Sequence, residues 1–408
     1  MESGQPSSPR LVRRLTLAHA VLYGVGVTIG AGIYVLVGVA AGRSGMYAPL
    51  GFLAAAMAMG LTAASFAELG TRMPVSASEA AYVQAAFRRR WLSLVMGLVV
   101  VATAVVSAAT ISAGSVSYIG VFVPLPAPLL ILAVVVLTGI IAGLATTQSI
   151  AFAGIMTLIE VGGLLLIIGA GFADGPEIVQ RLPEMLPGAD AAAWMSLGGT
   201  TLIAVFAFIG FEHIVNIAEE MKEPSRTLPR ALFVTLAVTA LLYMLVIWIS
   251  VTAVPPAELA RSPAPLALVF ERLTGMPLFT MSAIAIIATL NGIVVHIIMI
   301  ARVLYGLADQ GNLPAVLARV NPTTRTPLVA TLTGVAAILV LTLGVPLEGL
   351  ADLASSGTLA IFAGVNLALI AIKHRKAPAP EGIFVCPLWV AYAGLVTSLL
   401  LLALGWVS

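Results

Sequence analysis

The stretch Val25-Gly26-Val27-Thr28-Ile29-Gly30-Ala31-Gly32-Ile33-Tyr34 places three glycines within seven residues, in the middle of an apolar segment at about residues 15–41. Each glycine weakens a helix by about 1 kcal/mol relative to alanine, so this composition predicts an interrupted helix. Lipid cannot hydrogen-bond the backbone that an interruption exposes, and such breaks survive only where protein or water covers them. The stretch therefore predicts a binding site at mid-membrane. Close helix packing is the alternative explanation, because Gly26 and Gly30 also form a small-xxx-small face.

The composition of the chain is that of a polytopic membrane protein. Hydrophobic residues make up 60% of it and charged residues 9%, against about 25% charged residues in soluble domains. The single cysteine, Cys386, excludes an internal disulfide, and there is no Cys/His cluster, so we predict neither a metal nor a cofactor. The first apolar segment is too long for a signal peptide, so we expect it to be retained as a span.

Apolar segments long enough to cross a membrane recur along the whole chain. One crossing takes about 20 apolar residues. We therefore predict an all-α membrane protein with about eleven transmembrane helices, preceded by an N-terminal tail at residues 1–14. The predicted spans are residues 15–41, 48–70, 91–120, 127–145, 149–172, 196–219, 231–253, 278–306, 327–345, 349–372 and 388–406.

Positive charges are distributed unevenly between the two sides of this arrangement. Sixteen of the 20 Lys and Arg residues fall in segments on the same side as the amino terminus. The other four, Arg43, Arg181, Arg261 and Arg272, fall on the opposite side. Because loops rich in Lys and Arg stay in the cytoplasm, we predict a multi-pass protein of the cell membrane with a cytoplasmic amino terminus.

A second polar interruption lies in the sixth span, at residues 206–213, and it shares an Ile-Gly pair with the first. We pair the first span with the sixth, the second with the seventh, and so on through the fifth and tenth. The starts of the paired spans are then separated by similar numbers of residues. This predicts a transporter core at residues 15–372, built from two five-helix repeats at about 15–172 and 196–372, with 388–406 as an additional helix. Because five is odd, the repeats are inverted, and each opens with a broken helix.

The two interruptions present complementary backbone groups. The first frees amide donors around residues 29–32 at the start of a half-helix, where the amides and the helix dipole favour an anion such as a carboxylate. The second frees carbonyl groups near residues 206–210, which favour a cation such as an ammonium. Together they predict a site for the zwitterionic head group of an α-amino acid. Asn291, in the eighth span, is a further polar residue that we expect to touch a substrate or ion.

Two carboxyl groups lie inside predicted spans. Glu160 is near the middle of the fifth span, and Glu212 directly follows the break in the sixth. A charge at mid-bilayer is costly, so such groups face a cavity or are protonated, which makes both of them candidate proton carriers. Carboxyl groups that link helices by hydrogen bonds are the alternative. His296, in the eighth span, is a candidate for lining the cavity, and an interhelical packing role is its alternative.

Common enzyme motifs are missing from the chain, including the Gly-x-Ser-x-Gly, HExxH and P-loop patterns, so we predict that the protein is not an enzyme. The basic run Arg88-Arg89-Arg90 lies beside a span, where topology and contact with anionic lipid explain it without nucleic acid. The expected partners are therefore the lipid bilayer, a small substrate and a coupling ion.

Six motifs, taken in order, resemble the amino acid–polyamine–organocation permeases, and in particular their cationic-amino-acid-transporter-like branch. The run at residues 218–229 is highly specific. The full set lies at residues 26–38, 68–74, 206–212, 218–229, 301–314 and 356–359. The resemblance implies a five-plus-five inverted-repeat bundle of the LeuT type, which usually has twelve spans where this chain has eleven.

The resemblance also implies roles for individual residues. The substrate carboxylate would meet the amides of Ala31 and Gly32, and its amino group the carbonyl of Thr28. The carbonyls of Phe206 and Ile209 would complete the ammonium site, with Phe206 or Phe208 as an aromatic gate. The candidate substrate-binding residues are thus Thr28, Ile29, Gly30, Ala31, Gly32, Phe206, Ala207, Phe208, Ile209 and Asn291.

This chain departs from the family pattern at two of these positions. Family members often have serine at Ala31, so a hydroxyl contact to the substrate is lost here. Many proton-coupled relatives have a lysine at Glu160, and a glutamate does not replace that positive charge. The role of the lysine is therefore not carried over to this chain.

We therefore expect a secondary active amino acid transporter that works by alternating access. Its expected coupling ion is a proton, with sodium as the alternative, and its expected coupling residues are Glu160 and Glu212. An exchanger of amino acids, polyamines or other organic cations is the alternative within transport. A membrane sensor that binds amino acids without moving them is the alternative from another class.

Overall fold

The computed structural model describes residues 15–74, 78–144, 150–173, 180–375 and 378–405, and the predicted tail at 1–14 lies outside this range. Within these residues the chain is helical, apart from turns and one isolated parallel bridge between Leu15 and Met221. The elements are α1 (Leu17–Ser44), η1 (Gly45–Tyr47), α2 (Ala48–Arg72), α3 (Ser78–Phe87), α4 (Arg90–Ile119), α5 (Ala127–Leu144), α6 (Ile150–Ala173), η2 (Leu182–Met185), α8 (Ala191–Phe208), η3 (Phe211–Glu220), α9 (Pro224–Ala253), α10 (Pro256–Arg261), α11 (Pro265–Thr274), α12 (Phe279–Asp309), η4 (Ala315–Ala318), α13 (Leu328–Gly344), α14 (Leu347–His374) and α15 (Leu388–Leu404).

Each predicted span coincides with one helix of the structure, except the sixth, which coincides with α8 and η3 together. Among the described residues, eight helical segments are long and apolar enough to cross a membrane, and α13 and α15 are further apolar helices of 17 residues each. Large apolar side chains are exposed on the outside of the bundle, for example Leu137 on α5 and Leu332 and Val340 on α13. Exposed apolar side chains of this kind suit contact with lipid. The prediction of an all-α polytopic membrane protein is therefore confirmed.

The first span is not interrupted in this structure. Helix α1 runs as one element from Leu17 to Ser44, so the break predicted at residues 26–32 is wrong. Its glycines instead allow neighbouring helices to approach closely: a Cβ on Gly32 would lie 2.5 Å from the Cα of Ala207 on α8. A Cβ on Gly26 would overlap the Thr157 side chain on α6. Close packing, the alternative explanation, is therefore what the structure shows for Gly26 and Gly32.

The sixth span is interrupted as predicted. Helix α8 ends at Phe208, Ile209 has extended backbone angles, and the chain continues as the 3-10 helix η3. Gly210 has a φ of 121°, a conformation that side chains with a Cβ rarely adopt. The break therefore depends on glycine at this one position.

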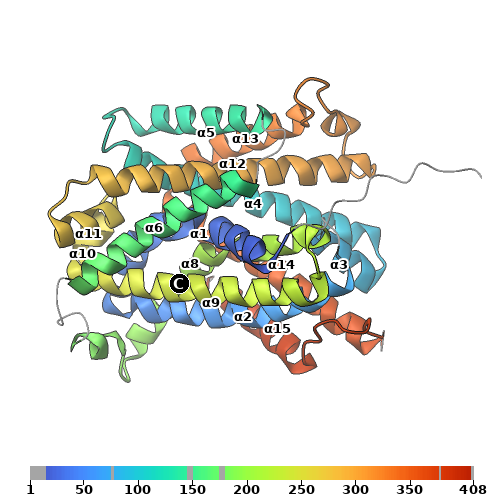
Figure 1. Ribbon diagram of the computed structural model, residues 1–408, viewed down its shortest axis with the longest axis horizontal. Coiled ribbons are helices and arrows are strands. Elements are labelled where there is room, and N and C mark those ends of the chain that lie inside the picture. The colour runs from blue at the N-terminus through green and yellow to red at the C-terminus, as the bar shows by residue number, and fades with distance from the viewer. Residues whose placement is uncertain (1–14, 75–77, 145–149, 174–179, 376–377, 406–408) are drawn as a thin grey trace, which may run out of the picture.

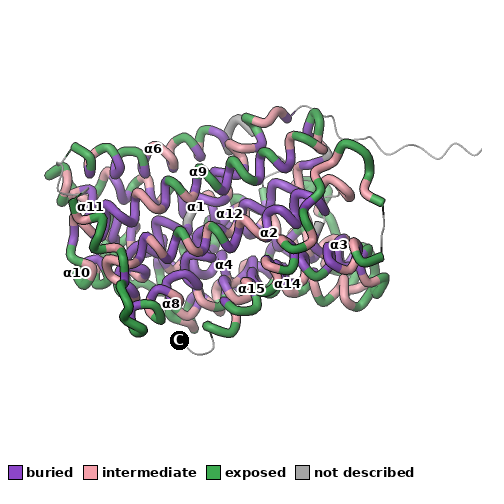
Figure 2. Tube along the Cα trace, turned by 90° about the horizontal axis from the view of Figure 1, so that it is seen from below, coloured by how far each residue is buried: buried purple, intermediate pink, exposed green. Residues whose placement is uncertain are grey.

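Eight of the long helices form two groups of four. In one group, α2 packs against α8 and α9, and α1 packs against both as well. In the other, α4, α5, α12 and α13 pack against one another. Figure 1 shows α5 and α13 at the top, α2 and α9 at the bottom, and α1 near the centre between α6, α9 and α12. Exposed residues follow the outer edge of the bundle, as along α6, while buried residues gather around α1 and α12 (Figure 2).

Both ends of α1 are attached to other parts of the bundle. Before its first turn, the Leu15 amide donates to the Glu220 carbonyl at 2.9 Å, and the Lys222 amide donates to the Leu15 carbonyl at 3.0 Å. At the opposite end, Arg43 pairs with Asp352 on α14 at 2.7 Å. Helix α1 is therefore held at both ends as well as along its length.

Candidate functional site

The break in the sixth span lies directly against α1. A Cβ on Gly210 would lie 2.8 Å from the carbonyl oxygen of Val27, and Gly32 meets Ala207 about one turn further along α1. The two segments thus touch backbone to backbone near the middle of both spans. Such an approach is possible only where side chains are missing.

Main-chain and side-chain hydrogen bonds satisfy backbone groups at the break and on the facing turn of α1. The Gly210 amide donates to Oε2 of Glu212 at 2.9 Å, and the Ile209 amide donates to the Phe206 carbonyl at 3.1 Å. On the other side, the Tyr243 hydroxyl from α9 lies 2.8 Å from the Thr28 carbonyl and 2.9 Å from the Ala207 carbonyl. The two amides at the break, those of Ile209 and Gly210, therefore both have hydrogen-bond partners.

A narrow cavity opens at this crossing, between the two groups of helices. We call it the crossing cavity; its walls are Val27, Thr28, Gly32, Ser107, Ile111, Phe206, Ile209, Gly292 and His296. These residues come from α1, α4, α8, α12 and the break itself. The cavity thus reaches both helix groups at the level of the interruption.

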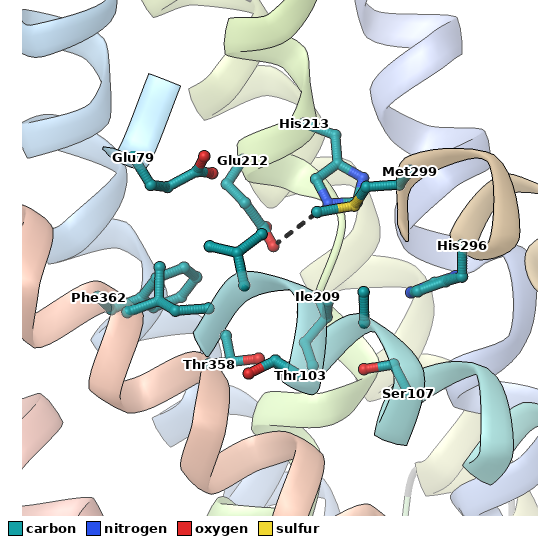
Figure 3. A pocket seen from close by; sticks show the side chains of 13 residues that line it. Glu79, Thr103, Ser107, Ile209, Glu212, His213, His296, Met299, Thr358 and Phe362 are labelled. Carbon is teal, nitrogen blue, oxygen red and sulfur yellow. Dashed lines mark ion pairs between the residues drawn. The ribbon is translucent and has the colours of Figure 1, made fainter. Parts of the chain in front are cut away.

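A second cavity shares the side chains of Ser107, Ile209 and His296 with the first. We call it the acidic cavity; its polar wall residues are Glu79, Thr103, Ser107, Glu212, His213, His296 and Thr358, and its apolar wall includes Met299 and Phe362. Figure 3 shows Thr103, Ser107 and Thr358 along one side of this cavity, opposite Glu212, His213 and His296. The two cavities form neighbouring compartments with a common wall.

Several predicted substrate-binding residues meet in the crossing cavity, namely Thr28, Gly32, Phe206 and Ile209. Ile29 and Ala207 are buried in the adjoining core. Gly30 and Ala31 belong to α1, but their surroundings lie outside what the structure describes. The amides of residues 29–32 fall within a continuous α-helix, where such groups bond to carbonyls four residues earlier.

Phe208 lies away from both cavities. Its ring packs against those of Phe52 and Tyr243, with centroids 6.5 and 5.1 Å apart. Of the two expected gate residues, only Phe206 lines one of the two cavities.

The two predicted coupling carboxyls occupy different surroundings. Glu212 lines the acidic cavity, with Oε1 at 3.9 Å from Nε2 of His213. Glu160 is fully buried, and its Oε1 accepts a hydrogen bond from Nδ2 of Asn291 at 3.1 Å. Neither Glu160 nor Asn291 contributes to the walls of the two cavities. The polar contact between α6 and α12 is therefore separate from the crossing.

Sequence reasoning missed the cavity residues that come from α4 and α14. Ser107 and Thr358 are 251 residues apart, and Ser107 belongs to none of the six family motifs. Thr358 lies in the motif at residues 356–359, but that motif indicated the family and gave Thr358 no role in a site. Serine and threonine in a helix usually bond to a carbonyl of the preceding turn, as Ser112 does to Ala108 at 2.7 Å. Only the three-dimensional arrangement shows that Ser107 lines the cavities and Ser112 does not.

A model of the family described as amino acid permease matches residues 15–408. This chain belongs to the amino acid permease family. The match covers every element of the described structure, including both cavities and the interrupted span.

Relatives of this permease carry the names of transporters for different substrates. It is 28% identical to the branched-chain amino acid permease BcaP of Bacillus subtilis, across the whole chain and 90% of that protein. It is 28% identical to the methylthioribose transporter of the same species, across 94% of the chain and 86% of that protein. It is 30% identical to the vacuolar cationic amino acid transporter 2 of Arabidopsis thaliana, across 93% of the chain but only 63% of that longer protein.

Proposed function

We propose that this permease is a secondary active transporter that moves an α-amino acid across the cell membrane by alternating access. The observation that carries the proposal is the crossing cavity, which lies at an interrupted span between two groups of helices. Membership of the amino acid permease family supports the substrate class. Movement of α1, α2, α8 and α9 against α4, α5, α12 and α13 would expose the cavity to each side in turn.

The head group of the substrate binds to main-chain groups at the crossing. Its ammonium meets the carbonyls of Thr28, Phe206 and Ile209, and its carboxylate meets the amides of Ala31 and Gly32. Because these amides lie within a continuous helix, binding requires a local opening of α1. Three glycines reduce the helical stability of this stretch by about 1 kcal/mol each, which lowers the cost of that opening.

We further propose that residues 15–172 and 196–372 are inverted repeats. The two groups of four helices support this, because each takes two consecutive spans from each half of the chain. The excess of Lys and Arg on one side supports a cytoplasmic amino terminus.

A proton is the proposed coupling ion, and Glu212 is its proposed carrier. Its carboxyl group is buried, lines the acidic cavity and bonds to the amide at the break. A change in its protonation would alter the hydrogen bond that holds Gly210. Glu160, buried beside Asn291, is the second candidate carrier.

Uptake by the purified permease in proteoliposomes tests this function. A screen of radiolabelled amino acids against an imposed pH gradient is expected to give uptake that stops when the gradient is collapsed. Uptake that needs a preloaded amino acid instead would identify an exchanger. Binding without flux would identify a sensor, and the absence of both binding and flux for every amino acid would overturn the proposal.

The coupling role of Glu212 has a matched test. Glu212→Gln keeps a side-chain oxygen for the Gly210 amide but removes the titratable group, so proton-driven uptake should be lost while exchange of substrate continues. Glu348→Gln makes the same chemical change at an exposed position on α14 and should leave uptake unchanged. An unaltered pH dependence in Glu212→Gln would remove this residue from the coupling role.

A further inference from the structure

Four exposed arginines lie together where α3 meets α4, at the end of the bundle where Figure 1 shows α3. Arg88, Arg89 and Arg90 are consecutive and connect the two helices. Arg375, directly after α14, reaches the same place, because its Nη1 atom donates to the Ala85 carbonyl on α3 at 3.4 Å. We call these four arginines the arginine corner. They place four positive charges on one area of the surface.

The charges of the arginine corner are not balanced by the protein. In the part of the chain that the structure describes, none of these four guanidinium groups pairs with a carboxylate. Two other cations at the same end of the bundle, Arg72 and Lys373, both pair with Glu68, at 2.7 and 2.8 Å. Like charges held close together repel one another, so a bound anion would stabilise the arginine corner.

The arginine corner lies at the edge of a membrane span. Helix α4 is long and apolar enough to cross a membrane, and Arg90 is its first residue. The next residue, Trp91, is exposed. Tryptophan is enriched where lipid headgroups meet the hydrocarbon region. The four guanidinium groups are therefore at the level of the headgroups.

An exposed apolar stripe continues from the arginine corner along α4. Trp91, Val95 and Leu98 are spaced four and three residues apart, so they lie on one face of the helix. They are 60%, 47% and 40% exposed, and we call them the α4 stripe. This face thus has positive charge at its end and apolar side chains beyond it. A phospholipid has the matching arrangement, with a phosphate at the end of its apolar chains.

We propose that the arginine corner and the α4 stripe together bind an anionic phospholipid. The guanidinium groups donate hydrogen bonds to the phosphate oxygens, often in pairs, and an acyl chain lies along the stripe. A lipid with net negative charge is favoured over a zwitterionic one, whose headgroup adds a further positive charge to the cluster. The site does not involve the two cavities, so its test is independent of the proposed function.

Competition between two lipids tests the site. Dioleoyl phosphatidylglycerol and dioleoyl phosphatidylcholine have the same acyl chains, and only the first carries a net negative charge. Native mass spectrometry of the purified permease, incubated with equal amounts of both, measures the ratio in which they are bound. We expect the ratio to favour phosphatidylglycerol and to fall about fivefold in Arg89→Gln, the equivalent of about 1 kcal/mol for one arginine near a membrane surface. Equal binding of the two lipids by the wild type would overturn the proposal.

A second variant and a control separate the site from general effects of folding and charge. Arg88 has a φ of 55°, a conformation that asparagine adopts readily, so Arg88→Asn removes the charge without adding backbone strain. It should lower the ratio as Arg89→Gln does, and an unchanged ratio in both would refute the site. Arg226→Gln is the control, because this exposed arginine on α9 pairs with Glu223 at 3.9 Å. An equal fall in the control would indicate a response to total charge and no specific site.

The contribution of the acyl chain is tested at the α4 stripe. Trp91→Ala removes apolar contact area, so it should reduce the retention of both lipids and leave their ratio unchanged. Trp389→Ala, at a tryptophan on α15 that is 68% exposed, is the matched control and should leave retention unchanged. Equal losses in the two variants would mean that the stripe is not part of the site.

The headgroup without its chains distinguishes a lipid site from a site for free phosphate. Glycerophosphoglycerol and inorganic phosphate, each at the concentration of the lipid, should not displace bound phosphatidylglycerol, because they lack the apolar chains that contact the α4 stripe. Displacement by either compound would identify a general anion site and contradict the assignment of a phospholipid.

Discussion

The first and sixth spans differ in a way that their glycine content does not predict. Helix α1 contains glycine at positions 26, 30 and 32 and continues through all of them, whereas the sixth span breaks at Gly210 alone. At Gly210 the freed amide donates a hydrogen bond to the Glu212 carboxyl group, and the backbone adopts a positive φ. Gly26 and Gly32 of α1 instead face other helices. A break in an apolar span thus depends on partners for the freed backbone groups, and glycine alone does not create it.

The largest effect is expected for Gly210→Ala, which tests whether the break in the sixth span requires glycine at this position. Its Cβ would lie 2.8 Å from the Val27 carbonyl oxygen, at a φ that alanine avoids. Backbone strain and overlap together should destabilise the fold by about 2–5 kcal/mol. The measurement is the melting temperature of the purified protein in detergent. Gly169→Ala on α6, where an added Cβ meets nothing within 4 Å, should not lower it. A normal melting temperature for Gly210→Ala would mean that the break is not held by glycine.

The packing role of the α1 glycines is tested by Gly32→Ala. The added Cβ would lie 2.5 Å from the Cα of Ala207, so the helices must separate, at a cost of about 1–3 kcal/mol. Thermal unfolding should show the loss, while Gly60→Ala on α2, where space is open, should show none. If Gly32→Ala keeps full stability but abolishes substrate binding, the glycine serves the site rather than the packing.

The hydrogen bond from the Gly210 amide to Glu212 is tested by comparing two substitutions of Glu212. Glu212→Ala leaves the Gly210 amide without its acceptor, which should cost about 1–2 kcal/mol more than Glu212→Gln, where the amide oxygen replaces the carboxylate oxygen. Thermal unfolding of both variants at neutral pH measures the difference. Identical melting temperatures would show that the freed amide finds another partner.

The smallest effect is expected for Tyr243→Phe. This change removes the hydroxyl that lies near the Thr28 and Ala207 carbonyls, and it should cost about 0.5–1.5 kcal/mol. Thermal unfolding measures this cost. The control is Tyr305→Phe on α12, at a residue that lines neither cavity. A larger loss than that of Glu212→Ala would mean that α9 contributes more to the break than η3 does.

Hydropathy predicted the spans well because lipid imposes a minimum apolar length on each crossing. The prediction of 127–145 matches α5 at Ala127–Leu144, and 388–406 matches α15 at Leu388–Leu404. The short helices α3, α10 and α11 lie between spans and lack that constraint, and they were not predicted. The break in α1 was wrongly predicted because helix propensity says nothing about which neighbour each glycine faces.

The candidate site was only partly predictable for a related reason. Thr28, Gly32, Phe206 and Ile209 lie within local patterns, and the structure brings all four to one cavity. The acidic cavity is made by side chains from five separate elements, and no local pattern records their convergence. Two of its hydroxyl groups are buried without a hydrogen-bond partner among the described residues, and this property depends on tertiary packing.

The bridge between Leu15 and Met221 has a mechanical consequence. Two main-chain hydrogen bonds there close the backbone from residue 15 to residue 222 into a ring. The beginning of the first span and the end of the sixth meet where that ring closes, so a displacement of one is transmitted to the other through main-chain hydrogen bonds. Motion of the two spans is therefore concerted at this end of the bundle.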